Sequence, residues 1–325
     1  MRSCTVVVVQ YNPVKEKLFR TILSIVKQKN ITVQIIIADD GSSEDYYEET
    51  ERMLQNHGFT DCCLSKNSTN QGTVMNYRNA VSFAKYKYIF GISPGDYYYD
   101  ETVLSEVVDT MEREGLQYLF GKVYPYRLEQ NKLKIVDLSL PSYTLPYIRY
   151  RKTKDIRFLQ KMIVVYRDNN PSPSFCWKKS TLNSFLNRIA GKIVYTEDLI
   201  RVFAFLDEIK TGYLNRYIAW YEYGTGISTS GNARWKEKIR KDENTFFQML
   251  MEQYPDSDLV KRANLFQKLE NIGGIRSRIL KILLFPDRFF YLLIHHVLYK
   301  EKNTPPDKDF IRSLYTEGDG ALTVR

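Results

Sequence analysis

Short apolar runs alternate with amphipathic stretches over the first third of the chain. Apolar, β-branched runs predict strands, and the segments between them carry apolar residues at helical spacing. The predicted strands are 6–9, 33–38, 61–65 and 88–92, and the predicted helices are 14–29, 44–56 and 73–84. Apolar strands separated by helices indicate βαβ units, and therefore a mostly parallel sheet with helices on both faces, an α/β fold.

Polar residues follow three of these strands. The three loops are Gln10-Tyr11-Asn12, Asp39-Asp40-Gly41 and Ser93-Pro94-Gly95-Asp96. Ligands of open parallel sheets bind beyond the carboxyl ends of the strands, which lie at one edge. The pattern therefore predicts a single site at that edge.

The alternation of predicted strands and helices weakens after residue 115. Residues 118–167 are rich in Tyr, Arg and Lys, and the turn-rich junction 169–174 follows. The pattern then predicts helices at 181–189 and 199–205 and extended segments at 193–195 and 218–223. Beyond residue 232 it is helical.

Two apolar helical segments, 275–285 and 289–299, lie near the end of the chain, separated by Pro286-Asp287-Arg288. Both are too short to cross a bilayer, and no segment offers 18 uninterrupted apolar residues, so no transmembrane helix is predicted. Arg276, Arg278 and Lys281 interleave with Ile and Leu in the first segment. Either the two segments lie in a membrane interface, or they form a buried hairpin that caps the domain.

The amino-acid composition limits which side chains can carry out catalysis. The 325 residues contain three His, namely His57, His295 and His296, two of which are neighbours. A three-His metal site or a Ser-His-Asp triad needs His distributed differently, so carboxylates must carry any catalysis. The four Cys show no CxxC spacing and the N-terminus lacks a secretory pattern, which favours a reducing, cytoplasmic location.

Charge is divided unevenly. The net charge is +9, but residues 1–110 carry 11 basic and 14 acidic side chains, whereas 111–325 carry 36 basic and 24 acidic. The excess of positive charge in residues 111–325 suits binding to an anionic substrate, an anionic membrane surface or nucleic acid. Nucleic acid is disfavoured because the basic residues form no aromatic-interleaved strand motif and the 25 Tyr are scattered.

Three acidic groups have both a functional and a structural interpretation. Asp39 and Asp40 either accept a hydrogen bond from a base or ribose or cap the next helix. Asp96 either binds a divalent cation that bridges phosphates or caps a turn. Glu197-Asp198, after Thr196, either supplies a general base or forms the acidic first turn of a helix.

The order of these motifs resembles family 2 glycosyltransferases of the GT-A fold, of the kind that builds bacterial capsule or lipopolysaccharide. The resemblance spans about residues 3–230 and includes the Asn70-Gln71-Gly72 turn and Arg78-Asn79 on the next helix. Five motifs in this order are jointly specific, although each alone is weak. The resemblance implies a GT-A domain at 1–230, with a nucleotide-sugar-binding half at 1–115 and an acceptor-side half at 116–230. A C-terminal helical region follows at 231–325, for which membrane association is one of the two alternatives given above.

The resemblance also implies roles for matching residues. Nucleotide-sugar binding falls to Gln10, Tyr11, Asn12, Asp39, Asp40, Gly72 and Arg78. Asp96 corresponds to the metal-contacting loop for Mg²⁺ or Mn²⁺, Asp198 to the general base, and Glu197 to its neighbour that orients the site. The sequence departs from the family in having Ser-Pro-Gly-Asp in place of Asp-x-Asp, which leaves metal dependence open. It also lacks Gln-x-x-Arg-Trp after Thr229, which favours single-sugar addition.

The resemblance therefore implies an inverting, non-processive transferase. It would move a sugar from a nucleotide-sugar donor, expected to be a UDP-sugar, to a saccharide or lipid-linked saccharide, in the cytoplasm or peripherally on the inner face of the membrane. The alternative is a catalytically silent nucleotide-sugar-binding or scaffold protein. The donor sugar, acceptor and linkage depend on pocket shape and stay open.

Overall fold

The first third of the chain forms the predicted alternating strands and helices. The computed structural model describes residues 2–129, 132–301, 308–316 and 323–324. The elements in order are β1 (Ser3–Gln10), α1 (Lys15–Val26), β2 (Thr32–Asp39), α2 (Tyr47–Asn56), β3 (Cys62–Lys66), α3 (Thr73–Ser82) and β4 (Tyr88–Ile92). Helix α2 begins at Tyr47, later than predicted, because Tyr46 has a left-handed backbone and Asp45 Oδ1 accepts the Tyr47 N–H.

The second third supplies the remaining strands and the helices around the site. Its elements are β5 (Tyr97–Tyr98), α4 (Val103–Glu114), β6 (Tyr118–Glu129), β7 (Lys132–Ile135), α5 (Thr144–Thr153), α6 (Arg157–Val164), η1 (Ser172–Ser174), β8 (Phe175–Lys178), α7 (Lys179–Ile189), η2 (Glu197–Ile200), α8 (Arg201–Leu206) and β9 (Thr211–Glu222). The predicted extended segment 193–195 forms no strand. Its backbone bonds to a helix and a side chain instead, as described below.

The strands form one mixed sheet. The order is β10-β7-β6-β8-β4-β1-β2-β3, with β9 pairing to β5 and β6. Strands β1 to β4 pair in parallel, while β8 runs antiparallel to both β4 and β6. The predicted parallel sheet is therefore confirmed for the N-terminal half and gains antiparallel strands in the second half.

Alternating residues of the central strands feed two cores on opposite faces. Val6 and Val8 of β1 point into the core that contains α1 and α4, whereas Val7 points into the core that contains α3 and α7. All three side chains are fully buried. A strand buried on both faces explains why the run is continuously apolar.

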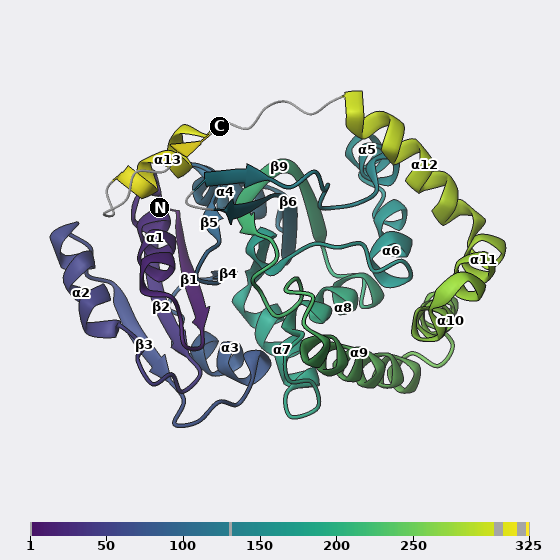
Figure 1. The fold of residues 1–325 in the computed structure, drawn as a ribbon, viewed down its shortest axis with the longest axis horizontal. Helices are drawn as coiled ribbons and strands as arrows, with labels where there is room; N and C mark the ends of the chain where they lie inside the picture. The colour runs from purple at the N-terminus through teal and green to yellow at the C-terminus, as the bar shows by residue number, and fades with distance from the viewer. Residues whose placement is uncertain (1, 130–131, 302–307, 317–322, 325) are drawn as a thin grey trace.

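The C-terminal helices complete the molecule (Figure 1). They are α9 (Ala233–Gln253), α10 (Asp258–Ile272), α11 (Gly274–Leu284), α12 (Pro286–Glu301) and α13 (Asp309–Thr316), followed by β10 (Thr323–Val324). Phe246 of α9 and Phe266 of α10 belong to the same core as α3 and α7. Helices α11 and α12 lie at the rim opposite α2, and α13 returns to pack on α1 (Figure 1).

The last long helices are not a buried hairpin. The two segments pack on the domain through α5 and α10, but eleven large apolar side chains between residues 272 and 297 are exposed. Among the residues described, no helix combines the length and hydrophobicity needed to cross a bilayer.

Candidate active site

Strands β1 and β2 end side by side, and their register pairs Gln10 with Asp39. Gln10 Nε2 donates to Asp39 Oδ2 at 3.0 Å, and the Ser42 N–H donates to Asp39 Oδ1 at 2.8 Å. Asp39 is fully buried. Its carboxylate therefore fixes the turn after β2 and does not cap α2, which begins eight residues further on at Tyr47.

Asp40 ties the same turn to the loop before α3. Its carboxylate accepts Asn67 Nδ2 at 2.9 Å and the backbone N–H groups of Gln71 and Gly72, both at 2.8 Å. Three hydrogen bonds on a buried carboxylate hold the two loops in one arrangement.

The outer surface of this edge is formed by the residues after β1. The Tyr11 side chain is 53% exposed. The Asn12 N–H donates to Ser42 Oγ at 2.7 Å. Gln10 Oε1 is buried without a hydrogen-bond partner in the described part of the chain. An exposed ring offers a stacking surface, and an unsatisfied acceptor suits a ligand N–H group.

Gly72 allows the segment that contains Val194 to approach the start of α3 closely. Its φ is +89°, and a Cβ there would lie 2.7 Å from the Val194 carbonyl oxygen. That carbonyl also accepts the Val74 N–H at 3.0 Å. Arg78, on the same helix, donates from Nε to Asn187 Oδ1 of α7 at 2.6 Å. The structure thus directs Arg78 toward α7, and a nucleotide contact by this residue stays a prediction.

Asp96 lies in a tight turn after β4. Thr21 on α1 fixes this turn by accepting the Gly95 N–H and donating to the Asp96 carbonyl. Asp96 Oδ1 accepts the backbone N–H of Glu222, at the end of β9, at 2.9 Å. The Glu222 carboxylate is paired with Lys17 Nζ, which lies 2.7 Å from each of its oxygens.

This arrangement determines how well a divalent cation fits at Asp96. Burial, and after it the Glu222 charge, raises the pKa of Asp96 well above its ordinary value, against the lowering effect of the Glu222 N–H and of Lys17. No hydrogen bond from a described residue reaches Asp96 Oδ2. Within the described ranges no three His, Cys, Asp or Glu side chains gather as a metal-binding group. Asp96 Oδ2 therefore offers a cation one carboxylate oxygen, and the other ligands would have to be phosphate oxygens. A metal at Asp96 stays a prediction.

Glu197 and Asp198 lie in η2, and their carboxylates have different partners. Ser172 Oγ donates to Glu197 Oε1 at 2.7 Å. Burial, and after it the Asp198 charge, raises the pKa of Glu197. Asp198 Oδ2 instead accepts Arg201 Nη1 at 2.7 Å, and this guanidinium also binds the Asp198 carbonyl. Asp198 keeps part of its surface exposed, whereas Arg201 is buried.

A buried carboxylate on α9 holds the segment that leads into η2. Asp242 Oδ2 accepts the Tyr195 N–H at 2.6 Å, the Val194 N–H at 3.2 Å and the Thr196 hydroxyl at 3.4 Å. This explains why 193–195 forms no strand, because its N–H groups bond to a side chain. It also makes α9 a support of the residues that precede Glu197.

The Tyr221 hydroxyl lies within the electrostatic reach of both acidic groups. Burial first, and then the Asp96 charge, raises the pKa of Tyr221, and the Asp198 charge contributes in the same direction. The loop after β4 and η2 therefore face a common region beside β9. Asp96 and Asp198 are 102 residues apart in sequence.

The sequence pattern did not reveal most of the residues that lie beside Asp96, Glu197 and Asp198. Lys17 and Glu222 are 205 positions apart, and no local pattern reveals such a pair. Ser172 lies in the junction recognised only as turn-rich. Arg201 had a detectable signal, because a cation three residues after Asp198 is suitably placed for an (i, i+3) pair.

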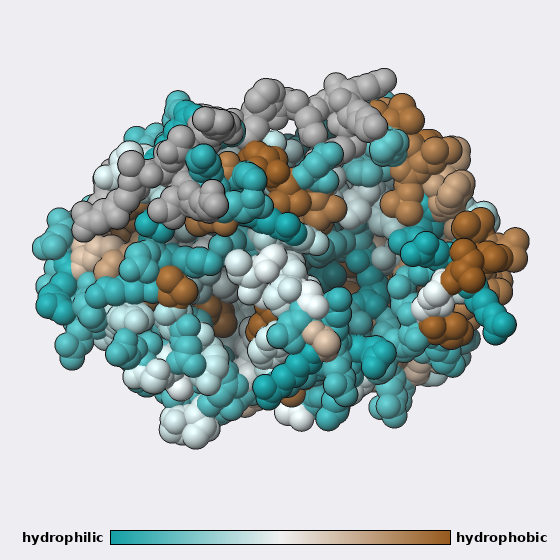
Figure 2. Space-filling model, in the orientation of Figure 1, coloured by the Kyte–Doolittle hydropathy of each residue, from teal (hydrophilic) through white to brown (hydrophobic). Residues whose placement is uncertain are grey.

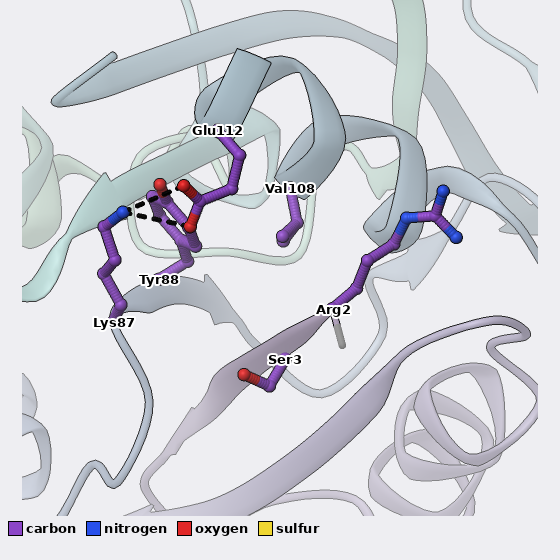
Figure 3. A pocket seen from close by; sticks show the side chains of 6 residues that line it. All are labelled: Arg2, Ser3, Lys87, Tyr88, Val108 and Glu112. Atoms are coloured by element: carbon purple, nitrogen blue, oxygen red, sulfur yellow. Dashed lines mark hydrogen bonds and ion pairs between the residues drawn. The ribbon is translucent and has the colours of Figure 1, made fainter. Parts of the chain in front are cut away.

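A separate cavity of about 280 Å³ lies at the opposite edge of the sheet. It is lined by Arg2, Ser3, Lys87, Tyr88, Val108 and Glu112, and Lys87 Nζ lies 3.0 Å from both Glu112 oxygens (Figure 3). Ser3 and Tyr88 begin their strands. This cavity therefore belongs to the amino edge and not to the site at the carboxyl edge.

Solved structures share this fold. S. aureus TarS residues 1–349 in complex with UDP-GlcNAc has a TM-score of 0.54 at 14% identity, over 88% of this chain and 76% of that one. The same protein in complex with UDP has a TM-score of 0.52 at 12% identity, over 88% and 75%. At these identities the likeness shows the fold, and it confirms the GT-A-like architecture.

No curated protein matches the chain. The family model for glycosyl transferase family 2 matches residues 5–169. This match contains most of β1, all of β2 to β4, both strand-end acidic groups and α5 to α6. It covers more than half of the 325 residues, and the chain therefore belongs to glycosyl transferase family 2.

Proposed function

We propose that this glycosyltransferase is inverting and non-processive, and that it moves a sugar from a UDP-sugar to a hydroxyl of a saccharide or lipid-linked saccharide in bacterial surface polysaccharide synthesis. One observation carries the catalytic part. The charges of Asp96 and Asp198, which lie on separate loops, both raise the pKa of Tyr221, and this supports a site in which a donor phosphate at Asp96 meets an acceptor hydroxyl at Asp198.

Asp198 is the proposed general base. Its carboxylate is 31% exposed, is oriented by Arg201 and is accessible to an acceptor hydroxyl. Asp198 takes the hydroxyl proton as the acceptor oxygen bonds to the anomeric carbon. The bond from that carbon to the phosphate oxygen breaks, its electron pair leaves with the nucleoside diphosphate, and attack from the opposite face inverts the anomeric centre.

The donor lies beyond the ends of β1 and β2 in this proposal. The exposed Tyr11 ring and the unpartnered Gln10 Oε1 suit a base, and Asp39 and Asp40 keep their loops in place. The UDP and UDP-GlcNAc complexes of S. aureus TarS support a uridine nucleotide as carrier.

Family 2 enzymes commonly depend on a divalent metal, and Asp96 Oδ2 offers one carboxylate oxygen to it. Asp96 would hold Mg²⁺ or Mn²⁺, with donor phosphates as the remaining ligands. A bound cation would supply charge neutralisation of the leaving diphosphate. Lys17 keeps Glu222 neutralised beside Asp96 and so limits the negative charge that the diphosphate meets.

The rival function is a catalytically silent nucleotide-sugar-binding protein. The single carboxylate of Ser93-Pro94-Gly95-Asp96, in place of Asp-x-Asp, favours it. The two functions differ in whether the bound donor is consumed, because many transferases slowly hydrolyse their donor without an acceptor.

The test combines donor binding with UDP release. Wild-type protein is incubated with a set of UDP-sugars and Mn²⁺, and Asp198→Asn is compared with Asp256→Asn, an exposed acid in the turn between α9 and α10. We expect Asp198→Asn to keep donor affinity within about twofold while lowering UDP release about 100-fold or more, since general-base catalysis contributes roughly 10²- to 10⁴-fold. Asp256→Asn should match wild type.

Each contrary result has a distinct meaning. Undiminished UDP release by Asp198→Asn would exclude Asp198 as the base. A wild type that binds donor yet releases no UDP, even with saccharide acceptors, would favour the silent protein. Absence of binding to every UDP-sugar would reject the proposed donor class.

A further inference from the structure

Helix α11 turns its apolar side outward. Its buried residue, Ser277, donates to the Leu269 carbonyl at 2.6 Å, and Lys281 pairs with Glu270 of α10. At about 100° per residue, Ile275, Ile279 and Ile282 lie opposite Ser277. Ile275 is 68% exposed, and the other two are about half exposed. A helix that buries Ser and Lys while exposing Ile is the reverse of an ordinary surface helix.

Helix α12 continues the exposed apolar surface. Its inner side is anchored by polar contacts, with Arg288 Nε donating to Tyr143 OH at 2.9 Å and His295 Nδ1 lying 2.6 Å from Thr144 Oγ1. Its outer side exposes Phe289, Phe290, Leu293 and Val297, each slightly more than half. The hydropathy surface shows brown side chains gathered over α11 and α12 (Figure 2). We call the exposed apolar side chains of residues 272–297 the outer ridge.

Positive charges outnumber negative ones beside the outer ridge, where Lys281 is already paired with Glu270 of α10. Residues 271–300 contain five basic side chains and one acidic one, Asp287. Asp287 is already neutralised by Lys161 at 2.5 Å and bonded by Tyr166. Arg276 and Arg278 flank the Ile stripe of α11 on its two sides, and within the described chain neither has an ion pair.

We propose that the outer ridge docks on an anionic lipid bilayer, with its apolar side chains inserted between headgroups and Arg276 and Arg278 at the phosphates. Flanking arginines with long apolar stems suit this depth, because they extend toward the headgroups while the ridge enters the acyl boundary. A second copy of the chain fits less well, since a twofold contact through the ridge would bring identical cations together. The proposal does not depend on the reaction being glycosyl transfer.

The experiment measures vesicle binding by the full chain. Vesicles of phosphatidylcholine alone are compared with vesicles that also contain phosphatidylglycerol, by flotation at low and high salt. We expect about tenfold or stronger preference for the anionic vesicles, reduced by salt. Arg276→Glu with Arg278→Glu should abolish that preference, whereas Arg52→Glu on α2, at the opposite rim, should keep it.

Two further variants test insertion separately from adsorption. Ile279→Glu with Leu283→Glu alters only exposed side chains, and we expect about tenfold weaker binding at unchanged melting temperature and UDP release. Phe83→Glu, an equally exposed apolar residue on another face, is the matched control. Phe290→Trp should lose fluorescence on vesicles with brominated acyl chains, and Phe83→Trp should not.

Several results would overturn the proposal. One is wild-type binding that does not distinguish the two vesicle types, and another is binding that the ridge variants leave unchanged. Absence of quenching in Phe290→Trp would exclude insertion. If wild type ignores vesicles but forms a dimer in solution that Ile279→Glu with Leu283→Glu dissociates, the occupant of the ridge is a second copy.

Discussion

Glu197 and Asp198 are adjacent carboxylates with different partners. Burial and the Asp198 charge raise the pKa of Glu197 to about 7, while Ser172 and Arg201 act in the lowering direction. Tyr77 of α3 also lies within its electrostatic reach. Asp198 is instead ion-paired with Arg201 and accessible. Neighbouring acids in such different environments are suited to different roles, which favours Asp198 as base and Glu197 as a positioning residue.

The Glu197 environment predicts a pH dependence of stability. Between the ordinary pKa of 4.5 and about 7, the folded protein keeps a proton on Glu197 that the unfolded chain has released. Folding stability therefore falls as pH rises through this window. Glu197→Gln keeps the acceptor for Ser172 and should remove about 3 kcal/mol of that fall, because each unit of the rise from 4.5 to about 7 corresponds to roughly 1.4 kcal/mol. Urea unfolding at pH 4.5 and 8 measures it.

The comparison between variants isolates Glu197 from a second acid. Burial also raises the pKa of Asp168 to about 6, which gives wild type and Glu197→Gln the same background trend. A stability difference between the two proteins that does not change with pH would contradict the prediction.

At the scale of elements, α9 holds the segment before η2 in place through the Asp242 side chain. Asp242 satisfies two backbone N–H groups and a hydroxyl in the segment just before Glu197. Val194 of that segment also contacts Gly72 and Val74 at the start of α3. The segment is thus held between α9 and α3, and its position sets that of the proposed base.

Asp242→Ala tests this support. It leaves the partly buried N–H groups of Val194 and Tyr195 without their acceptor, so we expect the unfolding free energy to fall by about 1–2 kcal/mol. Turnover should fall more than donor affinity. Asp242→Asn keeps an acceptor oxygen and should rescue both quantities, which denaturation and UDP-release assays measure. Normal turnover in a destabilised Asp242→Ala protein would show that the segment does not position the base.

The elements also show what sequence pattern can and cannot predict. Strands β1 to β4 and the polar loops after them were predicted because apolar runs and the βαβ rule are local information. The segment 193–195 was wrongly predicted as extended, because its hydrogen-bond partner lies 47 residues away from Tyr195 on α9. The Lys17–Glu222 pair at Asp96 could not be predicted either, since it depends on how β9 completes the sheet.

At the scale of the whole molecule, the charge division follows the fold. The acidic-leaning residues 1–110 build the strand-end loops, and the basic remainder contains the outer ridge. The sequence showed the excess of cations, but only the structure shows that Arg276 and Arg278 flank apolar side chains that point outward.

Ligand binding should be visible in the stability of the whole protein. UDP at about 100 times its Kd adds roughly 2.7 kcal/mol to the folded state, or about 4 °C in melting temperature for a chain of this size. We expect Mn²⁺ to enlarge the shift caused by UDP in wild type but not in Asp96→Asn, as measured by a thermal melt of each protein with and without ligand. Equal enlargement in both proteins would contradict a metal at Asp96.

Helix α13 joins the end of the chain to its beginning. Tyr315 lies edge-on to Tyr97, the residue after Asp96, and their hydroxyls are 3.2 Å apart, while Arg20 of α1 stacks on the Tyr315 ring. Helix α13 thus packs against the N-terminal half, although Tyr97 and Tyr315 are 218 residues apart in sequence. A truncation that removes the outer ridge together with everything after it would also disturb the Asp96 turn, so the ridge must be studied by substitution within an otherwise intact chain.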